Sequence, residues 1–282
     1  MQDSPAREHA PNHWEKLVRH WSNIGYPLQP CAEDIAVYER FAERAAREGK
    51  GGLRALLLGV TPKIAASRWP EGTALTAIDN SPWVIEALWP APGTPDGARV
   101  ICADWRAMPI ASGAIGFAVG DGCNSGLPFP GVLGAISGEV ARVLRPGGLF
   151  LFRVFVRPDP AETVDDVACA LASGRIGSVH VLKWRLVGAL CRDAERGVRL
   201  GDVWAVWNDM RRLTARLGER PGWTAAEIET MDYYRHSDTR FYFPTLAQIR
   251  ALMARDFADI GYVCGGYELA HQCPILVCVK QA

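Results

Sequence analysis

One glycine turn and two acidic residues follow three successive apolar runs of this chain. The turn spans residues 58–62, with the sequence LGVTP, and Asp79 and Asp104 each end one of the next two runs. In open α/β sheets, ligands bind beyond the carboxyl ends of the parallel strands. If the three runs are such strands, these features lie together at one sheet edge, in position to hold a ligand.

The turn combines features that suit a bound group. Gly59 allows the backbone to turn sharply and to approach a ligand without a clash from a Cβ atom. Thr61 can cap the helix that follows, and Pro62 can be its first residue. The N-terminus of a helix at that place favours a carboxylate or a phosphate. A plain strand–helix turn accounts for the same residues equally well.

The two acidic residues, Asp79 and Asp104, indicate which kind of ligand could bind. Asp79 follows Gly59 by twenty residues and can accept hydrogen bonds from both hydroxyls of a ribose. Burying its carboxylate without such a partner would be costly. Asp104 can accept a hydrogen bond from an adenine amino group, and Ala103 or Trp105 can line the ring. A helix cap or an ion pair with Arg106 is the alternative for Asp104. Together the residues favour a ligand that contains a nucleoside.

The elements that must position these residues alternate between strand and helix. Short apolar runs bounded by glycines or polar residues predict strands buried on both faces: 53–58, 73–79, 98–104, 114–121 and 147–156. Helical stretches fall between most of them, at about 62–68, 82–88 and 132–143. Such alternation predicts an α/β fold with a doubly wound, mostly parallel sheet.

The flanking regions differ from this core. Apolar residues at helical spacing predict helices over 13–22, 33–48, 161–173, 178–196, 201–217, 224–230 and 245–254. Strand patterns return over 259–269 and 273–281, about three residues apart, and predict an antiparallel hairpin. We therefore expect four parts: an N-terminal helical cap (1–49), a cofactor-binding core (50–157), a helical insertion or lid (158–255) and a C-terminal hairpin that completes the sheet (256–282).

Composition excludes several classes of protein. The 31 basic and 31 acidic residues cancel, which argues against a nucleic-acid partner. No apolar run approaches the roughly 18 residues of a membrane helix, and no signal peptide is apparent. None of the eight cysteines forms a C-x-x-C pair, so we expect reduced thiols in a cytoplasmic protein and no metal site.

The motifs resemble those of the class I S-adenosylmethionine-dependent methyltransferases. The resemblance covers about 50–156 well and 258–281 more loosely. It is carried by LLLGVTP (56–62), LTAIDNSP (75–82), VICADWRAMPI (100–110), FAVGDGCNSG (117–126) and EVARVLRPGGLFLF (139–152). The pairing of G-V-T-P with D-W-R-x-M-P resembles one subgroup of the family. The chain departs from the usual pattern in having a single glycine in the turn, and Gly116 where many members have Asp.

The resemblance implies a seven-stranded Rossmann-like sheet with an antiparallel last strand, S-adenosylmethionine as cofactor and methyl transfer to an acceptor. The residues that it assigns to the cofactor are Gly59, Val60, Thr61, Asp79, Asn80, Ala103, Asp104, Trp105, Gly120, Asp121 and Gly122.

The acceptor is less defined. Methyl transfer is an in-line displacement that depends mostly on positioning, and it needs a base only if the acceptor must lose a proton. Asp121 or Asn124 could orient an acceptor, although capping side chains of a tight turn explain both equally. His236 is a candidate base, with a hydrogen-bonded surface residue as the alternative. The Asn-Pro-Pro-aromatic pattern of base and glutamine methylation is missing, so we expect a small-molecule acceptor bound by a monomer or homodimer.

Two other functions stay open. A binding or regulatory protein could keep the nucleoside pocket without catalysis. A nicotinamide-dependent reductase would need G-x-G-x-x-G after the first strand, and a P-loop NTPase would need G-x-x-x-x-G-K-[ST]; the chain has neither motif.

Overall fold

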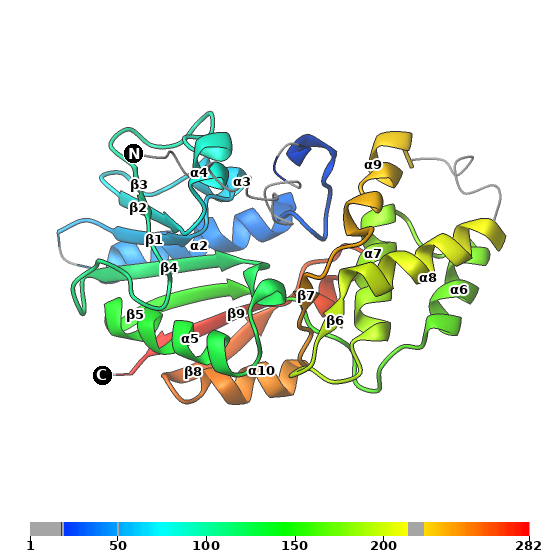
Figure 1. The fold of residues 1–282 in the computed structure, drawn as a ribbon. Helices are drawn as coiled ribbons and strands as arrows, with labels where there is room; N and C mark the ends of the chain where they lie inside the picture. The colour runs from blue at the N-terminus through cyan, green and yellow to red at the C-terminus, as the bar shows by residue number, and fades with distance from the viewer. Residues whose placement is uncertain (1–17, 19, 50, 214–222, 282) are drawn as a thin grey trace, which may run out of the picture.

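The computed structural model describes residues 18, 20–49, 51–213 and 223–281 (Figure 1). Its centre is a seven-stranded sheet in the order β3-β2-β1-β4-β5-β9-β8. The strands are β1 (Arg54–Leu58), β2 (Ala74–Asp79), β3 (Arg99–Cys102), β4 (Ile115–Asp121), β5 (Leu144–Arg153), β8 (Phe257–Val263) and β9 (Ile275–Lys280). The first five are parallel, and β9 runs antiparallel to both of its neighbours. The doubly wound fold predicted from the sequence is confirmed.

The register brings the carboxyl ends of the strands together. Leu58 at the end of β1 pairs with Ile78 of β2 on one side and with Gly120 of β4 on the other. Alternate side chains of β1 enter different hydrophobic clusters, Leu56 on one face of the sheet and Leu57 on the other. Burial on both faces explains why the run reads as continuously apolar.

Helices cover both faces of the sheet. One face packs against α2 (Ala32–Glu48), α3 (Pro62–Ala65) and α4 (Pro82–Leu88), and the other against α5 (Gly131–Val143) and α10 (Leu246–Met253). The start of α4 follows from local chemistry, because the Ser81 hydroxyl accepts a hydrogen bond from the Val84 backbone N–H at 3.3 Å and Pro82 is the first helical residue.

The insertion lies beyond the carboxyl ends of the strands (Figure 1). It contains α6 (Val164–Ala172), α7 (Val179–Leu190), α8 (Leu200–Leu213), α9 (Ala225–Glu229) and η4 (Asp232–Tyr234). These elements share a hydrophobic cluster separate from the two clusters of the sheet. Of the helix predicted over 201–217, residues 201–213 belong to α8, and residues 214–217 lie outside the described residues. None of the described helices is both long and apolar enough to cross a membrane.

Two predictions for the insertion and the C-terminus were wrong in detail. The insertion is not wholly helical, because β6 (Val198–Arg199) and β7 (Arg240–Phe241) form a two-stranded antiparallel sheet. The β8–β9 pairing is antiparallel as expected, but the connection is residues 264–274 rather than about three residues. This connection includes η5 (Ala270–Gln272), and the Gly266 backbone N–H donates to the Glu33 carboxylate of the N-terminal helix α2 at 2.6 Å.

The N-terminal region combines one helix with a segment that follows no regular pattern. The helix predicted over 33–48 is α2, and the Cys31 backbone N–H donates to the Asp34 carboxylate at 3.0 Å to cap it. Most of the helix predicted over 13–22 lies outside the described residues, and Trp21–Asn23 form the short 3-10 helix η1. Residues 24–31, between η1 and α2, are irregular chain, and the Pro27 carbonyl accepts a hydrogen bond from Arg153 at the end of β5.

Candidate functional site

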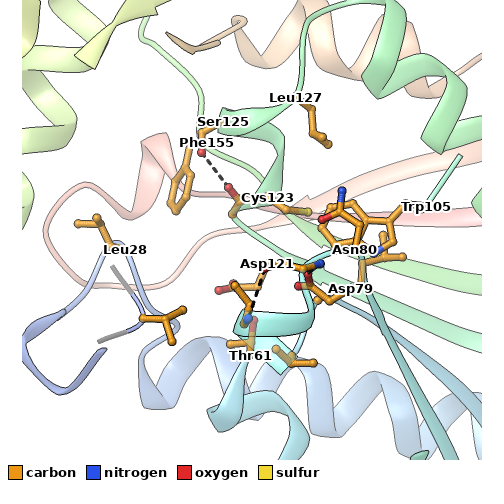
Figure 2. Close-up of a pocket in the computed structure, with 18 of the residues that line it drawn as sticks. Leu28, Thr61, Asp79, Asn80, Trp105, Asp121, Cys123, Ser125, Leu127 and Phe155 are labelled. Atoms are coloured by element: carbon orange, nitrogen blue, oxygen red, sulfur yellow. Dashed lines mark hydrogen bonds between the residues drawn. The ribbon is translucent and has the colours of Figure 1, made fainter. Parts of the chain in front are cut away.

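A cavity of about 550 Å³ lies at the carboxyl edge of the sheet, between the strand ends, the N-terminal segment and the insertion (Figure 2). This volume falls within the range of small-molecule sites in proteins. Nine of the residues predicted for the cofactor line it: Gly59, Val60, Thr61, Asp79, Asn80, Asp104, Trp105, Asp121 and Gly122. The other two predicted residues, Ala103 and Gly120, are not among the lining residues.

The turn after β1 is held against the end of β2. Gly59 has a φ of +86°, a conformation that favours glycine, and its backbone N–H donates to the Ile78 carbonyl at 2.7 Å. The Trp105 indole N–H donates to the same carbonyl at 2.6 Å. Thr61 occupies the expected N-cap position, but its side chain makes no capping bond and the helix after it is a single turn.

Asp79 presents a carboxylate to the cavity without a cationic partner. Its Oδ1 accepts a hydrogen bond from the Ser81 backbone N–H at 2.9 Å, and it forms no ion pair with the residues that the structure describes. Burial raises the pKa of this carboxyl, partly offset by the backbone N–H groups of Ser81 and Asn80. The carboxylate keeps lone pairs for a ligand that donates hydrogen bonds.

Asp104 is arranged differently from Asp79. Its carboxylate forms an ion pair with Arg106, with an Nη2–Oδ2 distance of 2.5 Å, at the partly exposed rim of the cavity. The Arg106 guanidinium lowers the pKa of this carboxyl. The ion pair that the sequence offered as an alternative is therefore present. The backbone N–H of Ala103 donates to the Asp79 carbonyl at 3.0 Å, which joins the ends of β2 and β3.

Asp121 lines the cavity from the end of β4, and its carboxylate is already paired. The buried Arg153 guanidinium donates from Nε to Oδ1 at 2.5 Å and from Nη2 to Oδ2 at 3.0 Å. The Tyr38 hydroxyl donates to Oδ1 at 3.0 Å. Arg153 also donates to the Pro27 carbonyl at 2.8 Å and lies 3.7 Å from the Asp34 carboxylate. These bonds fix Asp121 as part of a buried cluster.

Sequence reasoning missed Arg153, although a signal was present. A single charged residue stands within the apolar run 147–156. A cation in a buried strand requires a carboxylate partner, because an unpaired buried charge is costly. That requirement could have pointed to an acid at the end of a neighbouring strand.

Asn124 and His236, two of the predicted catalytic residues, do not line the cavity. Asn124 is buried, and its side-chain amide both donates to and accepts from the Phe155 backbone, each at 2.9 Å. It therefore fixes the loop after β4 to the end of β5. His236 has a φ of +58°, and its ring lies 6.3 Å from that of Trp204, centre to centre. Neither residue is positioned to act on a ligand in this cavity.

The end of the cavity away from Asp79 is apolar and aromatic. Figure 2 places Leu28 and Phe155 there, on the opposite side of Asp121 and Cys123 from Asn80 and Trp105. The insertion closes this end with Trp184 of α7, Tyr234 of η4 and Phe241 of β7. Residues 158–255 contain many aromatic residues, but the convergence of these three at one end of the cavity depends on the packing of three separate segments.

Within the described part of the chain, no group of three or more His, Cys, Asp or Glu side chains could hold a metal ion. Cys123, which lines the cavity, has its pKa raised by burial, with the Asp121 and Asp79 carboxylates adding to the effect. Its thiol is therefore protonated at neutral pH.

The fold is similar to those of several solved methyltransferase structures. The chain matches the CurJ carbon methyltransferase with a TM-score of 0.53 and 11% identity, covering 90% of this chain and 56% of that one. It matches the N-methyltransferase NodS from Bradyrhizobium japonicum WM9, in complex with S-adenosyl-L-homocysteine, with a TM-score of 0.51 and 11% identity, covering 96% and 99%. No protein-family model and no curated protein sequence matches the chain. These similarities show the fold.

Proposed function

We propose that the protein is an S-adenosylmethionine-dependent methyltransferase that acts on a small molecule. The observation that carries the proposal is the Asp79 carboxylate, partly buried at the end of β2 beside the Gly59 turn and without a cationic partner among the described residues. Such a carboxylate in this fold suits the two hydroxyls of a ribose. The resemblance of the sequence motifs to the class I family supports the same cofactor.

The structural neighbours add support. CurJ and NodS are both named as methyltransferases, and NodS was solved with S-adenosyl-L-homocysteine, the demethylated form of the cofactor. Their printed names include both a carbon and a nitrogen methyltransferase, so the fold is compatible with different acceptor atoms.

Each wall of the cavity has a separate role in this proposal. Asp79 accepts hydrogen bonds from the ribose, and Trp105 and Asn80 flank the space for the base. Gly59 and Gly122 allow the backbone to approach the ligand closely. When bound, the cofactor supplies a methyl group activated by the sulfonium. Since Asp121 is paired with Arg153, the chain's contribution to transfer is positioning and the exclusion of water rather than proton removal by this carboxylate.

A small acceptor agrees with the size of the cavity, about 550 Å³. The cavity is bounded on one side by the N-terminal segment and on another by α7, η4 and β7 of the insertion. We propose that these two regions act as cap and lid, with residues 50–157 and 256–282 as the core. A cytoplasmic location, and either a monomer or a homodimer, remain part of the proposal.

Isothermal titration tests the cofactor. We expect S-adenosylmethionine and S-adenosylhomocysteine to bind and NADH not to bind. A hydrogen bond to a charged group contributes about 1.5–3 kcal/mol and one to a neutral group about 0.5–1.5 kcal/mol. Asp79→Asn should therefore cost about 1–1.5 kcal/mol for each of the two ribose bonds, so affinity should fall roughly 30- to 150-fold. Asp96→Asn, in an exposed loop outside the cavity, is the matched control and should leave affinity unchanged.

The alternatives give different results. Binding of NADH with no response to the other two ligands would identify a reductase. Unchanged affinity in Asp79→Asn would remove the ribose role of that residue. Binding of both sulfur-containing ligands without turnover on any small-molecule acceptor would favour a regulatory protein.

A further inference from the structure

We infer that the methyl acceptor is an uncharged, ring-bearing molecule that occupies the aromatic end of the cavity. This inference rests on the proposed function and adds the chemical class of the acceptor. The aromatic end is defined by Ile24, Leu28, Phe155, Trp184, Tyr234 and Phe241. Figure 2 shows Leu28 and Phe155 separated from Asn80 and Trp105 by the loop that carries Cys123.

Charge is distributed unevenly along the cavity. The charged side chains among the described lining residues all come from the strand ends or the loops that follow them: Asp79, Asp104, Arg106 and Asp121. The polar groups at the aromatic end are uncharged: the hydroxyls of Ser125, Thr239 and Tyr234 and the indole N–H of Trp184. The Ser125 hydroxyl already donates to the Gly122 carbonyl at 3.1 Å. A charged acceptor would lose its hydration there without gaining an ion-pair partner.

Aromatic walls can attract cations, but two of these rings already have a basic group over one face. The Arg153 guanidinium lies 5.3 Å from the centre of the Phe155 ring, and the Lys183 amine lies 5.3 Å from the centre of the Tyr234 ring. A cationic acceptor would compete with these groups for the electron-rich faces. Lys183 itself does not line the cavity, because its amine is buried and donates to the Thr230 hydroxyl.

The walls are fixed by packing against one another. The Trp184 ring meets Phe155 edge-to-face at 4.6 Å between centres and 84° between planes, and meets Phe241 at 5.8 Å and 76°. Tyr234 meets Phe241 in the same manner at 6.3 Å and 77°. Rings in such arrangements form a preformed apolar site that another ring can extend by stacked or edge-to-face contacts.

A matched set of probes tests this inference by titration calorimetry, with S-adenosylhomocysteine present. The probes are 2-naphthol, 6-hydroxynaphthalene-2-sulfonate and the corresponding compound with a trimethylammonium group in place of the sulfonate, which share one ring system and differ in charge. We expect 2-naphthol to bind at least tenfold more tightly than either charged probe. Equal or tighter binding of a charged probe, or no binding of any of the three, would overturn the inference.

A charge placed at the aromatic end provides the second test. Leu28→Lys should weaken binding of 2-naphthol at least fivefold and strengthen binding of the sulfonate at least fivefold. Leu190→Lys is the matched control, because Leu190 is also partly buried against the core of the insertion but does not line the cavity. An equal effect of both substitutions would contradict the inference. Binding of S-adenosylhomocysteine, measured in the same samples, shows separately whether the proposed function holds.

Discussion

Asp121 and Arg153 are direct register partners at the ends of the neighbouring parallel strands β4 and β5, and their side chains form a bidentate ion pair at the wall of the cavity. The same guanidinium donates to the Pro27 carbonyl. The pair therefore joins the sheet edge to the N-terminal segment that closes the site. The sequence left open whether Asp121 orients an acceptor or caps a tight turn, and in the structure its carboxylate is held by Arg153 and Tyr38.

Asp121→Asn should lower the free energy of unfolding by about 3–5 kcal/mol, because it leaves the buried Arg153 without its closest countercharge. Urea denaturation measures this change. Asp165→Asn, at an exposed position of α6, should change stability by less than about 0.5 kcal/mol. If Asp121→Asn abolished turnover while leaving the urea midpoint unchanged, Asp121 would be a catalytic residue instead.

Lys183→Met should stabilise the protein at neutral pH. The Lys183 side chain is fully buried, and desolvation lowers its pKa from 10.5 to about 7. The unfolded chain therefore holds this proton more tightly, so the free energy of unfolding falls as the pH drops from about 10.5 to about 7. Replacing the buried amine with an apolar chain of similar shape should add about 1–4 kcal/mol at pH 7.

Urea denaturation of the wild type and of Lys183→Met from pH 7 to pH 9.5 gives the difference between their free energies of unfolding. This difference reports the titration of Lys183 alone, because all other titrating groups are common to both proteins. We expect the difference to shrink steadily as the pH rises. A constant difference across the range would show that Lys183 keeps its ordinary pKa.

Gly122→Ala should disturb the site as well as the fold. Gly122 has a φ of +64°, and an added Cβ would lie 2.3 Å from the Phe155 ring, which lines the cavity. Gly147 has a φ of +70° with nothing within 4 Å of an added Cβ, so Gly147→Ala should show only the backbone cost of about 1–2 kcal/mol. Gly122→Ala should lower the free energy of unfolding by about 1–3 kcal/mol more than Gly147→Ala does, because its Cβ clashes with Phe155.

Thermal or urea denaturation of the two glycine variants measures the stability difference. Titration with 2-naphthol measures the displacement of Phe155, and only Gly122→Ala should weaken that binding. Equal stability losses in both variants would mean that the Phe155 ring moves aside without cost.

Asp79→Asn should raise the stability of the ligand-free protein while it weakens cofactor binding. Burial raises the pKa of this carboxyl above 3.8, so the free energy of unfolding of the wild type falls as the pH rises from about 3.8 through the raised pKa. The amide removes this cost at neutral pH. Urea denaturation at pH 7 should therefore give a higher free energy of unfolding for Asp79→Asn than for the wild type. A lower value would show that the Asp79 carboxylate stabilises the fold.

The sheet could be predicted from sequence because the inner parallel strands β1, β2 and β4 are mostly buried and their sequences are nearly continuous apolar runs. The edge strand β3 is only partly buried, which differs from the burial on both faces that its sequence predicted. Gly59, Asp79 and Trp105 lie at or just after the carboxyl ends of β1, β2 and β3. Because these ends meet at one edge of the sheet, the sequence could predict that the three residues line one cavity. These relationships depend on local pattern and on a general rule for open sheets.

Other features depend on contacts between distant segments, which no local pattern records. Arg153 donates to the Pro27 carbonyl and pairs with the carboxylates of Asp34 and Asp121. Of these three residues, Asp121 belongs to a neighbouring strand, whereas Pro27 and Asp34 are distant in the sequence. The strands β6 and β7 are two residues each, too short for an alternating pattern, and they pair across most of the insertion. The aromatic end of the cavity forms through the same long-range packing.

The separate hydrophobic cluster of the insertion has a consequence for how such a protein can diversify. The residues that wall the aromatic end, including Trp184, Tyr234 and Phe241, belong to that cluster, whereas β1 and β2, which lead to Gly59 and Asp79, are buried in the two clusters of the sheet. Substitutions can therefore accumulate in one core without repacking the other. Under the function proposed above, we expect exchange of residues 158–255 between related chains to alter acceptor choice while the residues around Gly59 and Asp79 stay unchanged.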